Sequence, residues 1–252
     1  MHLNLLFDEQ FTGDIWRMEI DEQTGILFLE TRDHTDKKVQ FSAINLSAGN
    51  FLFKDLGIPE RWLTGIEAAY NGVLLLHFYQ TETGPAHKGL MAIDAQTRKT
   101  IWTDYALSFD YLSEKGPIVY DSRVHPRKLF LADIKTGATT RVYEPSVYKE
   151  LKNGIAYPQL TEAGNLPQQL GHKHPFGNTV HYLEHNNFRI VSLHALKGGG
   201  LIQLLEIFSE AGLIYEDIIN SAIQKMQPEA FILYKDHLIY IKNRSELKVL
   251  SL

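Results

Sequence analysis

The stretch MAIDAQTRKTIW (residues 91–102) contains an apolar strand, a turn and a second strand that ends in an aromatic residue. A polar turn between two short strands of this composition is typical of a β-hairpin. Three further stretches follow the same pattern: SAINLSAGNFLF (42–53), LADIKTGATTRV (131–142) and IFSEAGLIY (207–215). The repetition of one hairpin indicates a fold that is assembled from similar antiparallel units.

Each hairpin carries one residue at its turn that is expected to adopt positive φ. Gly49, Gly137 and Gly212 occupy this position, where glycine meets no Cβ penalty. Arg98 fills the same position in residues 91–102. This departure costs some stability, because residues with a Cβ avoid positive φ.

Each repeat also has two strand candidates before the hairpin. Runs such as ILFLE (from Ile26), VLLLHFY (from Val73) and FRIVSL (from Phe188) are rich in the aliphatic and aromatic residues of strands. Shorter candidates such as GIEAAY and TVHYLE precede these runs. Four antiparallel strands joined by short turns form one blade of a β-propeller.

The two ends of the chain complement each other. The last repeat ends at ELKVLSL (246–252) without a fourth strand, and the chain begins with HLNLLFDEQ (2–10), a strand without a repeat of its own. Pairing residues 2–8 with residues 246–252 would complete a fifth blade and cover an exposed edge. The sequence therefore predicts an all-β, single-domain, five-bladed β-propeller over residues 1–252, whose ring is closed by the N-terminal strand. The alternative is an open β-sandwich of similar strands.

Two segments depart from the repeat. Residues from about 146 to 178 are an insertion between the third and fourth blades, and loops of this length are usually functional or disordered. Residues 219–226 continue a helical spacing of apolar residues and could form a short amphipathic helix.

The hairpin of residues 91–102 resembles the quinoprotein-type (PQQ-type) propeller repeat. Ala92, Asp94, Thr97, Lys99 and Trp102 match its consensus, and Arg98 replaces its glycine. Partial matches occur in two other hairpins, at Asp133, Thr136 and Gly137 and at Ala43, Asn45 and Gly49. The resemblance implies blade architecture. The family's cofactor site cannot be carried over residue by residue, because quinoprotein dehydrogenases are about twice as long and have eight blades. The whole chain is also similar to an uncharacterised bacterial family of unknown function.

Composition excludes several classes of partner. The formal net charge is −5 and no basic run exceeds two residues, so a nucleic-acid partner is not expected. No apolar segment approaches the roughly 20 residues that span a bilayer, and the N-terminus lacks a signal sequence, so we expect a soluble, cytoplasmic protein without a membrane partner. The chain has no cysteine, which removes thiolate catalysis and cysteine-based zinc sites.

Several histidines and arginines map to the loops between the second and third strands of the blades, or to the insertion. The predicted ligand-binding residues on this loop face are His87, Arg123, His125, His172 and His174. Imidazole binds metals and guanidinium binds carboxylate or phosphate, so His34, Arg32 and Arg127 on the same face are further candidates. No third metal ligand can be identified for the His172–His174 pair, so the sequence predicts neither a metal site nor a cofactor.

Two classes of function fit this pattern. The first is a non-catalytic module that binds a protein partner or a small ligand on the loop face. The alternative is a hydrolase with its site at the mouth of the central channel, either metal-dependent or glycosidase-like, with Asp14, Glu67 and Asp110 as candidate carboxylates. No catalytic residue is assigned. Trp16, Trp62 and Trp102 could stack on a ligand or fill the space between blades. Convergent carboxylates or imidazoles would favour the hydrolase, and an exposed apolar patch the binding module.

Overall fold

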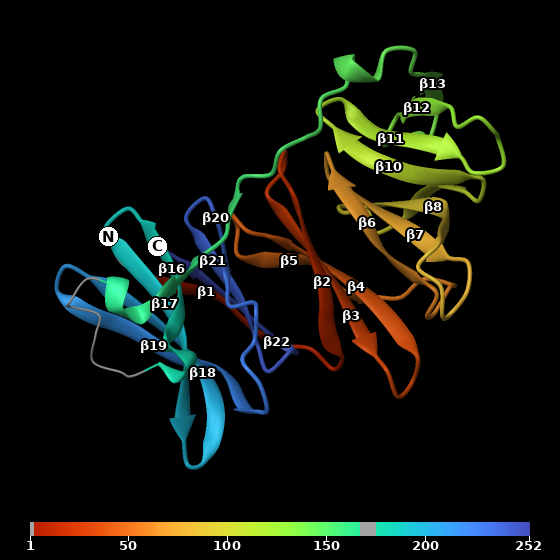
Figure 1. Cartoon of the computed structure of the whole chain (residues 1–252). Coiled ribbons are helices and arrows are strands. Elements are labelled where there is room, and N and C mark those ends of the chain that lie inside the picture. The colour runs from red at the N-terminus through yellow and green to blue at the C-terminus, as the bar shows by residue number, and fades with distance from the viewer. Residues whose placement is uncertain (1–2, 167–174) are drawn as a thin grey trace. The chain divides into compact units, whose positions relative to one another are not determined.

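The fold is all-β, as predicted. The computed structural model describes residues 3–166 and 175–252, and these form five antiparallel sheets of four or five strands (Figure 1). The helices in these residues are single 3-10 turns: η1 (Pro145–Val147), η2 (Ala163–Asn165) and η4 (Phe176–Asn178). Within the described ranges, no helix is long and apolar enough to cross a membrane.

Thr12–Asn153 form one of two compact units, which holds three four-stranded sheets. In each sheet the strands are neighbours in sequence order. Sheet 1 contains β2 (Asp14–Asp21), β3 (Ile26–Asp33), β4 (Lys38–Asn45) and β5 (Asn50–Leu56). Sheet 2 contains β6 (Thr64–Tyr70), β7 (Val73–Tyr79), β8 (His87–Asp94) and β9 (Thr100–Asp104). Sheet 3 contains β10 (Leu107–Ser113), β11 (Gly116–Asp121), β12 (Leu129–Ala132) and β13 (Thr139–Arg141).

The second unit combines the N-terminal segment up to Phe11 with Gly154–Leu252. Sheet 4 contains β15 (Gln159–Glu162), β16 (Thr179–His185), β17 (Phe188–Lys197), β18 (Gly200–Ser209) and β19 (Gly212–Ile223). Sheet 5 contains, in spatial order, β1 (Asn4–Gln10), β22 (Glu246–Ser251), β21 (His237–Lys242), β20 (Ile232–Tyr234) and β14 (Ile155–Ala156).

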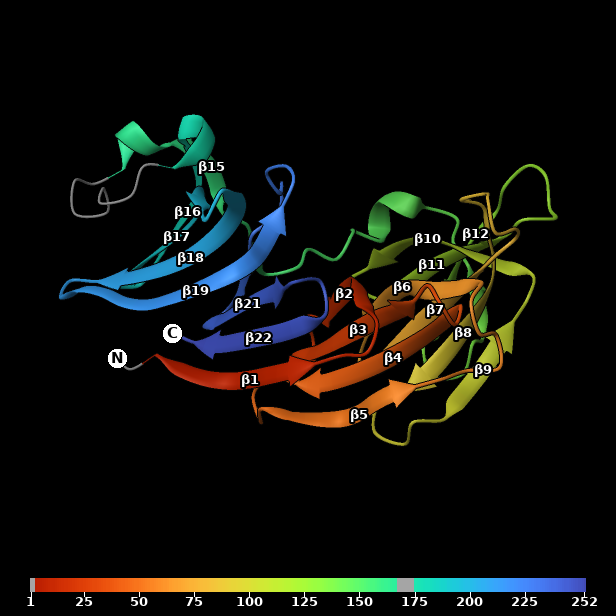
Figure 2. The same cartoon turned by 90° about the horizontal axis from the view of Figure 1, so that it is seen from below.

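The pairing predicted for the two chain ends is confirmed. Strand β1 runs antiparallel to β22, from Asn4 opposite Ser251 to Gln10 opposite Glu246 (Figure 2). Residue 2, which the prediction included, lies outside the described residues. The N-terminal strand therefore forms one edge of the five-stranded sheet 5, next to the last strand of the chain.

The insertion is less of a loop than the sequence predicted. Residues 155–156 pair with β20 and residues 159–162 pair with β16, so the segment adds one short strand to each of sheets 5 and 4. These strands satisfy backbone groups along the free edges of β20 and β16. Two and four residues are too few to leave a recognisable periodicity in the sequence.

The amphipathic helix predicted for residues 219–226 is wrong. Strand β19 extends to Ile223 and pairs with β18 along its length. Its register shifts between Leu201 and Gln203 and again between Gln203 and Leu204. These irregularities break the period-two alternation of a strand, and the apolar residues then fall at a spacing that resembles a helix.

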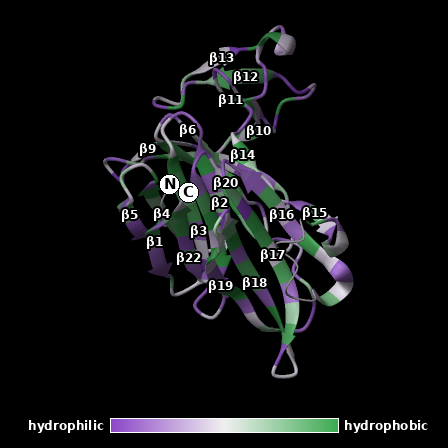
Figure 3. Ribbon diagram, turned by 90° about the vertical axis from the view of Figure 1, so that its left-hand side faces the viewer, coloured by the Kyte–Doolittle hydropathy of each residue, from purple (hydrophilic) through white to green (hydrophobic). Residues whose placement is uncertain are grey.

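Sheet 2 is buried on both sides. Leu74 and Leu76 belong to a core cluster shared with Phe28 and Phe41 of sheet 1, whereas Leu75 joins a cluster shared with sheet 3. Strands β7 and β8 are therefore apolar at nearly every position, as strands buried on two faces are. Hydrophobic residues run along the central strands of the sheets (Figure 3). In the second unit, Leu205 and Ile207 of sheet 4 share a core cluster with residues of sheet 5.

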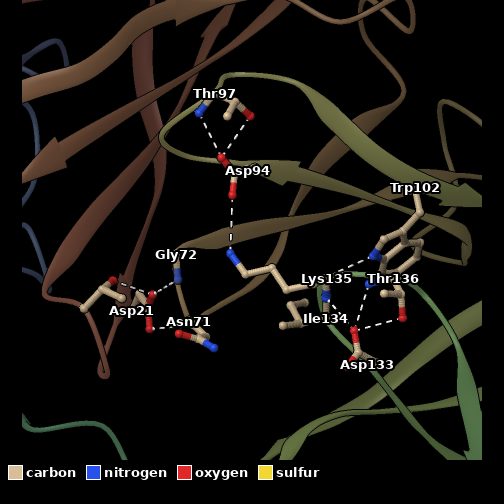
Figure 4. A network of polar contacts seen from close by, with 11 residues as sticks. Asp21, Asn71, Gly72, Asp94, Thr97, Trp102, Asp133, Ile134, Lys135 and Thr136 are labelled. Carbon is tan, nitrogen blue, oxygen red and sulfur yellow. Dashed lines mark hydrogen bonds and ion pairs between the residues drawn. The ribbon is translucent and has the colours of Figure 1, made fainter.

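The turn conformations predicted for the hairpins are confirmed. The φ angle is +62° at Gly49, +63° at Arg98, +72° at Gly137 and +110° at Gly212. In the turn of residues 94–98, the Asp94 carboxylate accepts hydrogen bonds from the backbone N–H and the hydroxyl of Thr97, at 2.8 and 2.9 Å. Asp133 and Thr136 repeat this arrangement at the same distances (Figure 4).

The same turns connect neighbouring sheets in the first unit (Figure 4). The Trp102 indole N–H of sheet 2 donates to the Ile134 carbonyl of sheet 3 at 2.8 Å. The buried Asp21 carboxylate at the first turn of sheet 1 accepts the backbone N–H groups of Asn71 and Gly72 in sheet 2, at 3.2 and 2.6 Å. The residues that resemble the quinoprotein-type repeat thus form the turns and the contacts between sheets.

Replacing Gly137 with valine is expected to lower the free energy of unfolding by about 2–5 kcal/mol. Positive φ strains a β-branched residue by about 1–3 kcal/mol, and a Cβ at Gly137 would lie 2.9 Å from the Trp102 ring, so overpacking adds to the strain. The matched variant Arg98→Gly should be neutral or stabilising by up to about 1 kcal/mol, because Arg98 holds the same φ with a side chain. Urea denaturation measures the free energy of unfolding of both variants. A stable Gly137→Val variant together with a destabilised Arg98→Gly variant would show that the two turns are not equivalent.

Candidate functional site

Three side chains of sheet 2 converge on one point. The Glu67 Oε2 atom lies 3.2 Å from Nδ1 of His77 and 3.0 Å from Nδ1 of His87. The two imidazole rings stack with centroids 3.5 Å apart and planes within 6°. His77 is buried, whereas the side chain of His87 is 35% exposed. The cluster is therefore open to solvent on one side and enclosed on the other.

Two β-bulges bring these residues together. In the pairing of β6 with β7, Ile66 lies opposite Leu76 and Ala68 opposite Leu75, so Glu67 is the extra residue of a bulge. A bulge redirects the side chain of its extra residue. In the pairing of β7 with β8 the extra residue is Gly89, with φ of +65°.

The bulge at Gly89 places His87 on the correct face of the sheet. Because of the extra residue, His87 lies opposite Tyr79 rather than opposite Gln80. Side chains alternate along a strand, so Tyr79 and His77 share one face, and His87 joins them. A Cβ at Gly89 would lie 3.0 Å from Cα of Tyr105. This close approach and the positive φ explain why a glycine occupies this position.

Burial and charge set the protonation of the cluster. Burial lowers the pKa of His77 below its ordinary value, against the pull of the Glu67 carboxylate, so the imidazole is held neutral at physiological pH. Burial alone would raise the pKa of Glu67, yet the adjacent His77 and His87 imidazoles keep it below its ordinary value. The cluster thus offers a carboxylate and at least one neutral imidazole.

These are the groups of the described residues that could hold a metal ion. In a tetrahedral zinc site with bonds of 2.0–2.1 Å, neighbouring ligand atoms are about 3.3 Å apart, close to the 3.0 and 3.2 Å observed here. The three ligand atoms all lie within 4.8 Å of one another, and no fourth ligand residue joins them in the described part of the chain. Nδ1 of the buried His77 faces the Glu67 carboxylate at 3.2 Å without hydrogen-bond geometry, and no other described residue bonds to its ring nitrogens. A metal ion held by the carboxylate and the imidazole would satisfy Nδ1.

Aromatic rings adjoin the cluster. The Tyr79 ring lies edge-on to His77 and His87, with centroids 4.7 and 5.1 Å away. The guanidinium carbon of Arg32 is 5.9 Å from the same Tyr79 ring, and 5.7 and 5.1 Å from the rings of Trp16 and Trp62. The buried Arg32 thus links the cluster to a group of aromatic side chains on sheet 1 and the segment before sheet 2.

Of the five residues predicted to bind a ligand, His87 lies in the three-residue cluster and Arg123 is paired with another side chain. His87 joins Glu67 and His77. Arg123 is bound to Asp121 by contacts of 2.7 and 2.9 Å, and His125 is exposed in the loop between β11 and β12. His172 and His174 lie outside the described residues, so the proximity predicted for them stays a prediction.

The other predicted arginines are also paired within the protein. Arg32 contacts Glu30 at 2.6 Å, and Arg127 contacts Asp110 at 2.5 Å. The guanidinium of Arg127 also lies over the ring of Tyr120, 3.4 Å from its centroid. The predicted partner of these arginines was a carboxylate or phosphate of a ligand, but in the structure each arginine pairs with a carboxylate side chain of the protein itself.

Glu67 and Asp110 occupy equivalent positions in their sheets, which the sequence did not reveal. Asp110 is the extra residue of a bulge between Phe109 and Tyr111, as Glu67 is in β6, and Trp16 is the extra residue in β2. Asp14 lies two residues before the bulge of β2 and is not part of this set.

Sequence reasoning missed His77. It lies inside the apolar run VLLLHFY, whose other members fill the core, and it was taken with them as a strand residue. One feature of the sequence does indicate a site: His77 is a titratable residue in a run whose other residues are apolar. A titratable group is costly to bury without a partner, so a partner for His77 could have been expected. Gly89 was a second signal, since a glycine inside a strand often marks a bulge.

Comparisons with known proteins show similarity to one family model and to solved β-propeller structures. Residues 20–102 match a family model described as a domain of unknown function (DUF4905), and this region contains Glu67, His77 and His87. No curated protein matches the chain. Among solved structures, the chain is similar to BamB from Moraxella catarrhalis at 10% identity, covering 100% of this chain and 98% of that one, with a TM-score of 0.38. It is also similar to the β-propeller domain of the Trilobed protease from Pyrococcus furiosus at 8% identity, covering 94% and 65%, with a TM-score of 0.35.

Proposed function

We propose that this protein is a five-bladed β-propeller, closed by its N-terminal strand, that binds a zinc ion at Glu67, His77 and His87. The five sheets of four or five antiparallel strands and the pairing of β1 with β22 support the propeller. The observation that carries the zinc site is the convergence of the buried His77, which makes no hydrogen bond of good geometry, with a carboxylate and a second imidazole. Two imidazoles and a carboxylate are a ligand set that zinc commonly takes.

The ligand set leaves one coordination position open. Structural zinc sites have four protein ligands, whereas three protein ligands leave a place for water or for an exogenous ligand. His87 is the exposed member of the cluster, so its side is the one from which an exogenous ligand would have access. We therefore propose a small-ligand-binding function in which an oxygen or nitrogen donor completes the zinc coordination.

A metal-dependent hydrolase is the second candidate. Convergent imidazoles and a carboxylate are the feature that favours it, since three ligands and an open position are the arrangement of catalytic zinc sites. Arg17 donates to the carbonyl of Glu67 at 3.0 Å and to the carboxylate of Glu19 at 3.3 Å, which places a second carboxyl group close to the site. Burial raises the pKa of Glu19 above its ordinary value, against the pull of Arg17, which makes this carboxylate a better proton acceptor.

Zinc titration of the metal-free protein tests the site. Isothermal titration calorimetry of protein dialysed against a chelator should give one tight site per chain. We expect His87→Ala and Glu67→Gln to weaken that binding by at least about 100-fold, because each removes a ligand. His87→Ala is preferred to His77→Ala because His87 is partly exposed and its removal leaves the core intact. Thermal denaturation of each variant confirms that it is folded.

His34→Ala is the matched control. His34 is an exposed histidine of the same unit that contacts Trp16 and Trp62 and is not part of the three-residue cluster. Its removal should leave zinc affinity unchanged. Equal zinc affinity in His87→Ala, Glu67→Gln and the unmodified protein would rule the site out, and so would the lack of a tight site in the unmodified protein.

A further inference from the structure

Trp16 presents an aromatic face to solvent. Its side chain belongs to the extra residue of the β2 bulge, and the residue is 60% exposed. The exposed His34 ring lies 5.9 Å from Trp16 and 5.4 Å from Trp62, edge-on to each. His34 thus joins the two indoles through edge-on contacts, and we name this group of three rings the Trp16 platform. A cluster of large aromatic groups at the surface, unlike a single exposed one, is a candidate binding surface.

The Trp16 platform is held rigidly from below by Arg32. The Arg32 guanidinium lies 5.7 Å from the Trp16 ring and 5.1 Å from the Trp62 ring, within the range of cation–π attraction. Its N–H groups donate to Glu30 at 2.6 Å and to the carbonyls of Thr64 and Trp62 at 2.6 and 3.3 Å. A binding surface that is fixed before its ligand arrives loses little conformational entropy on binding.

The charges around the platform favour a neutral ligand. Arg32 is paired with Glu30, and Arg17, the neighbour of Trp16, is paired with Glu19. These arginines are therefore already neutralised, which disfavours phosphate and carboxylate ligands. Nucleic-acid sites that stack bases on aromatic rings also need a positively charged groove, and this chain carries a net charge of −5.

A purely apolar ligand does not fit either. Covering Trp16 would also cover the nearby charged groups of Arg17 and Glu19, and burying these groups without hydrogen bonds is costly. A sugar ring satisfies both requirements, because one face carries C–H groups that pack on an indole and its edge carries hydroxyl groups that bind carboxylates and guanidinium groups. From this combination we propose that the Trp16 platform binds a neutral carbohydrate.

The carbohydrate site goes beyond the proposed zinc site and stands on different residues. The two are close, because Arg17 donates to the carbonyl of Glu67 and the Tyr79 ring contacts both zinc-ligand histidines. The stacking contact itself needs no metal.

Binding of a panel of neutral oligosaccharides tests the proposal. The panel comprises hexasaccharides of glucose, galactose, mannose, xylose and arabinose. Each is titrated by isothermal titration calorimetry, and quenching of tryptophan fluorescence by acrylamide is recorded for the unmodified protein. At least one should bind and protect the indole from the quencher. We expect Trp16→Ala to weaken that binding by at least about tenfold, and Trp16→Phe to restore part of it, because a smaller ring keeps part of the stack.

Tyr143→Ala is the matched control, because Tyr143 is an even more exposed aromatic residue of the same unit, at 85%. Its removal should leave carbohydrate affinity unchanged. Unchanged affinity in Trp16→Ala, or binding of no member of the panel, would overturn the proposal. The titrations are repeated with a chelator and with His87→Ala, and zinc affinity is measured on Trp16→Ala. Loss of carbohydrate binding with retained zinc binding in Trp16→Ala separates this site from the zinc site, and a failed zinc site leaves the carbohydrate result readable.

Discussion

Deleting residues 1–9 should abolish cooperative folding of the unit that contains sheets 4 and 5. The deletion removes most of β1 and exposes the hydrogen-bonding edge of β22, where Leu247, Val249 and Leu250 are otherwise buried. It also removes the buried Phe7, and losing a buried phenylalanine alone costs about 3–5 kcal/mol. Typical domains are stable by only about 5–15 kcal/mol, so the combined loss is expected to exceed what the unit can tolerate.

The deletion also breaks an ion pair that is partly buried. Lys248 lies in β22 and its Nζ atom contacts Asp8 of β1 at 2.6 Å and Glu246 at 2.9 Å. Without Asp8 the Lys248 side chain, 11% exposed, keeps one carboxylate partner next to an uncovered strand edge. An unprotected edge strand pairs readily with other chains, so we expect insoluble protein or large aggregates.

Soluble expression and size-exclusion chromatography measure the outcome. Two full-length variants keep the test informative if the deletion yields no protein. Phe7→Ala should remain soluble with a lowered melting temperature, whereas Leu5→Ser should change it little, because Leu5 is 52% exposed in the same strand. A soluble deletion variant with an unchanged melting temperature would contradict the structural role of β1.

The sequence predicted those parts of the fold that follow local rules. The hairpins of residues 42–53 and 91–102 could be recognised because an apolar strand, a turn residue with positive φ and an aromatic strand end recur in order. The pairing of β1 with β22 followed from counting strands, since one end lacked a strand and the other had one to spare. Both inferences use short-range patterns that alternation and turn chemistry impose.

The candidate site could not be predicted in the same way, because it depends on register. Glu67 and His87 reach the same point as His77 only because of two bulges, and a bulge shifts which residues share a face. Without the extra residue Gly89, His87 would lie opposite Gln80, on the other face of the sheet from His77. Glu67 and His87 were named as candidates for separate reasons, a carboxylate of an inner strand and a loop histidine, and nothing in the sequence joined them.

The equivalence of Trp16, Glu67 and Asp110 was hidden for the same reason. Each follows two or three strand residues, but their chemical types differ, and alignment by residue type does not superimpose them. The backbone repeats the bulge in sheets 1, 2 and 3 while the side chain at the bulge changes from indole to carboxylate. The same bulge therefore carries an indole in the first strand of sheet 1 and a carboxylate in the first strands of sheets 2 and 3.

The Glu30–Arg32 pair connects the Trp16 platform to the neighbouring sheet. Both side chains are buried, in β3, and the Glu30 carboxylate also accepts the backbone N–H of Ile66 in β6 at 2.8 Å. A Cβ at Gly65 would lie 3.0 Å from that carboxylate, so a glycine leaves room for it. Sheets 1 and 2 are therefore joined at this point by charge as well as by the apolar core.

Arg32→Ala is expected to destabilise the unit of sheets 1–3 by about 3–5 kcal/mol. The change leaves the Glu30 carboxylate buried without its counter-charge, and breaking a buried pair on one side has a cost of this size. It also removes donors from the carbonyls of Thr64 and Trp62.

The double variant Glu30→Gln/Arg32→Met should lose much less stability, because it removes both charges and keeps most of the side-chain volume. Arg123→Ala is the control. Arg123 contacts Asp121 through two nitrogen atoms, whereas Arg32 contacts Glu30 through one. The Arg123 side chain is 73% exposed, however, so no measurable change in the free energy of unfolding is expected. Denaturant unfolding of the three variants and of the unmodified protein measures these differences in the free energy of unfolding. A double variant less stable than Arg32→Ala would mean that the pair itself, rather than the buried charge left behind, stabilises the contact between the sheets.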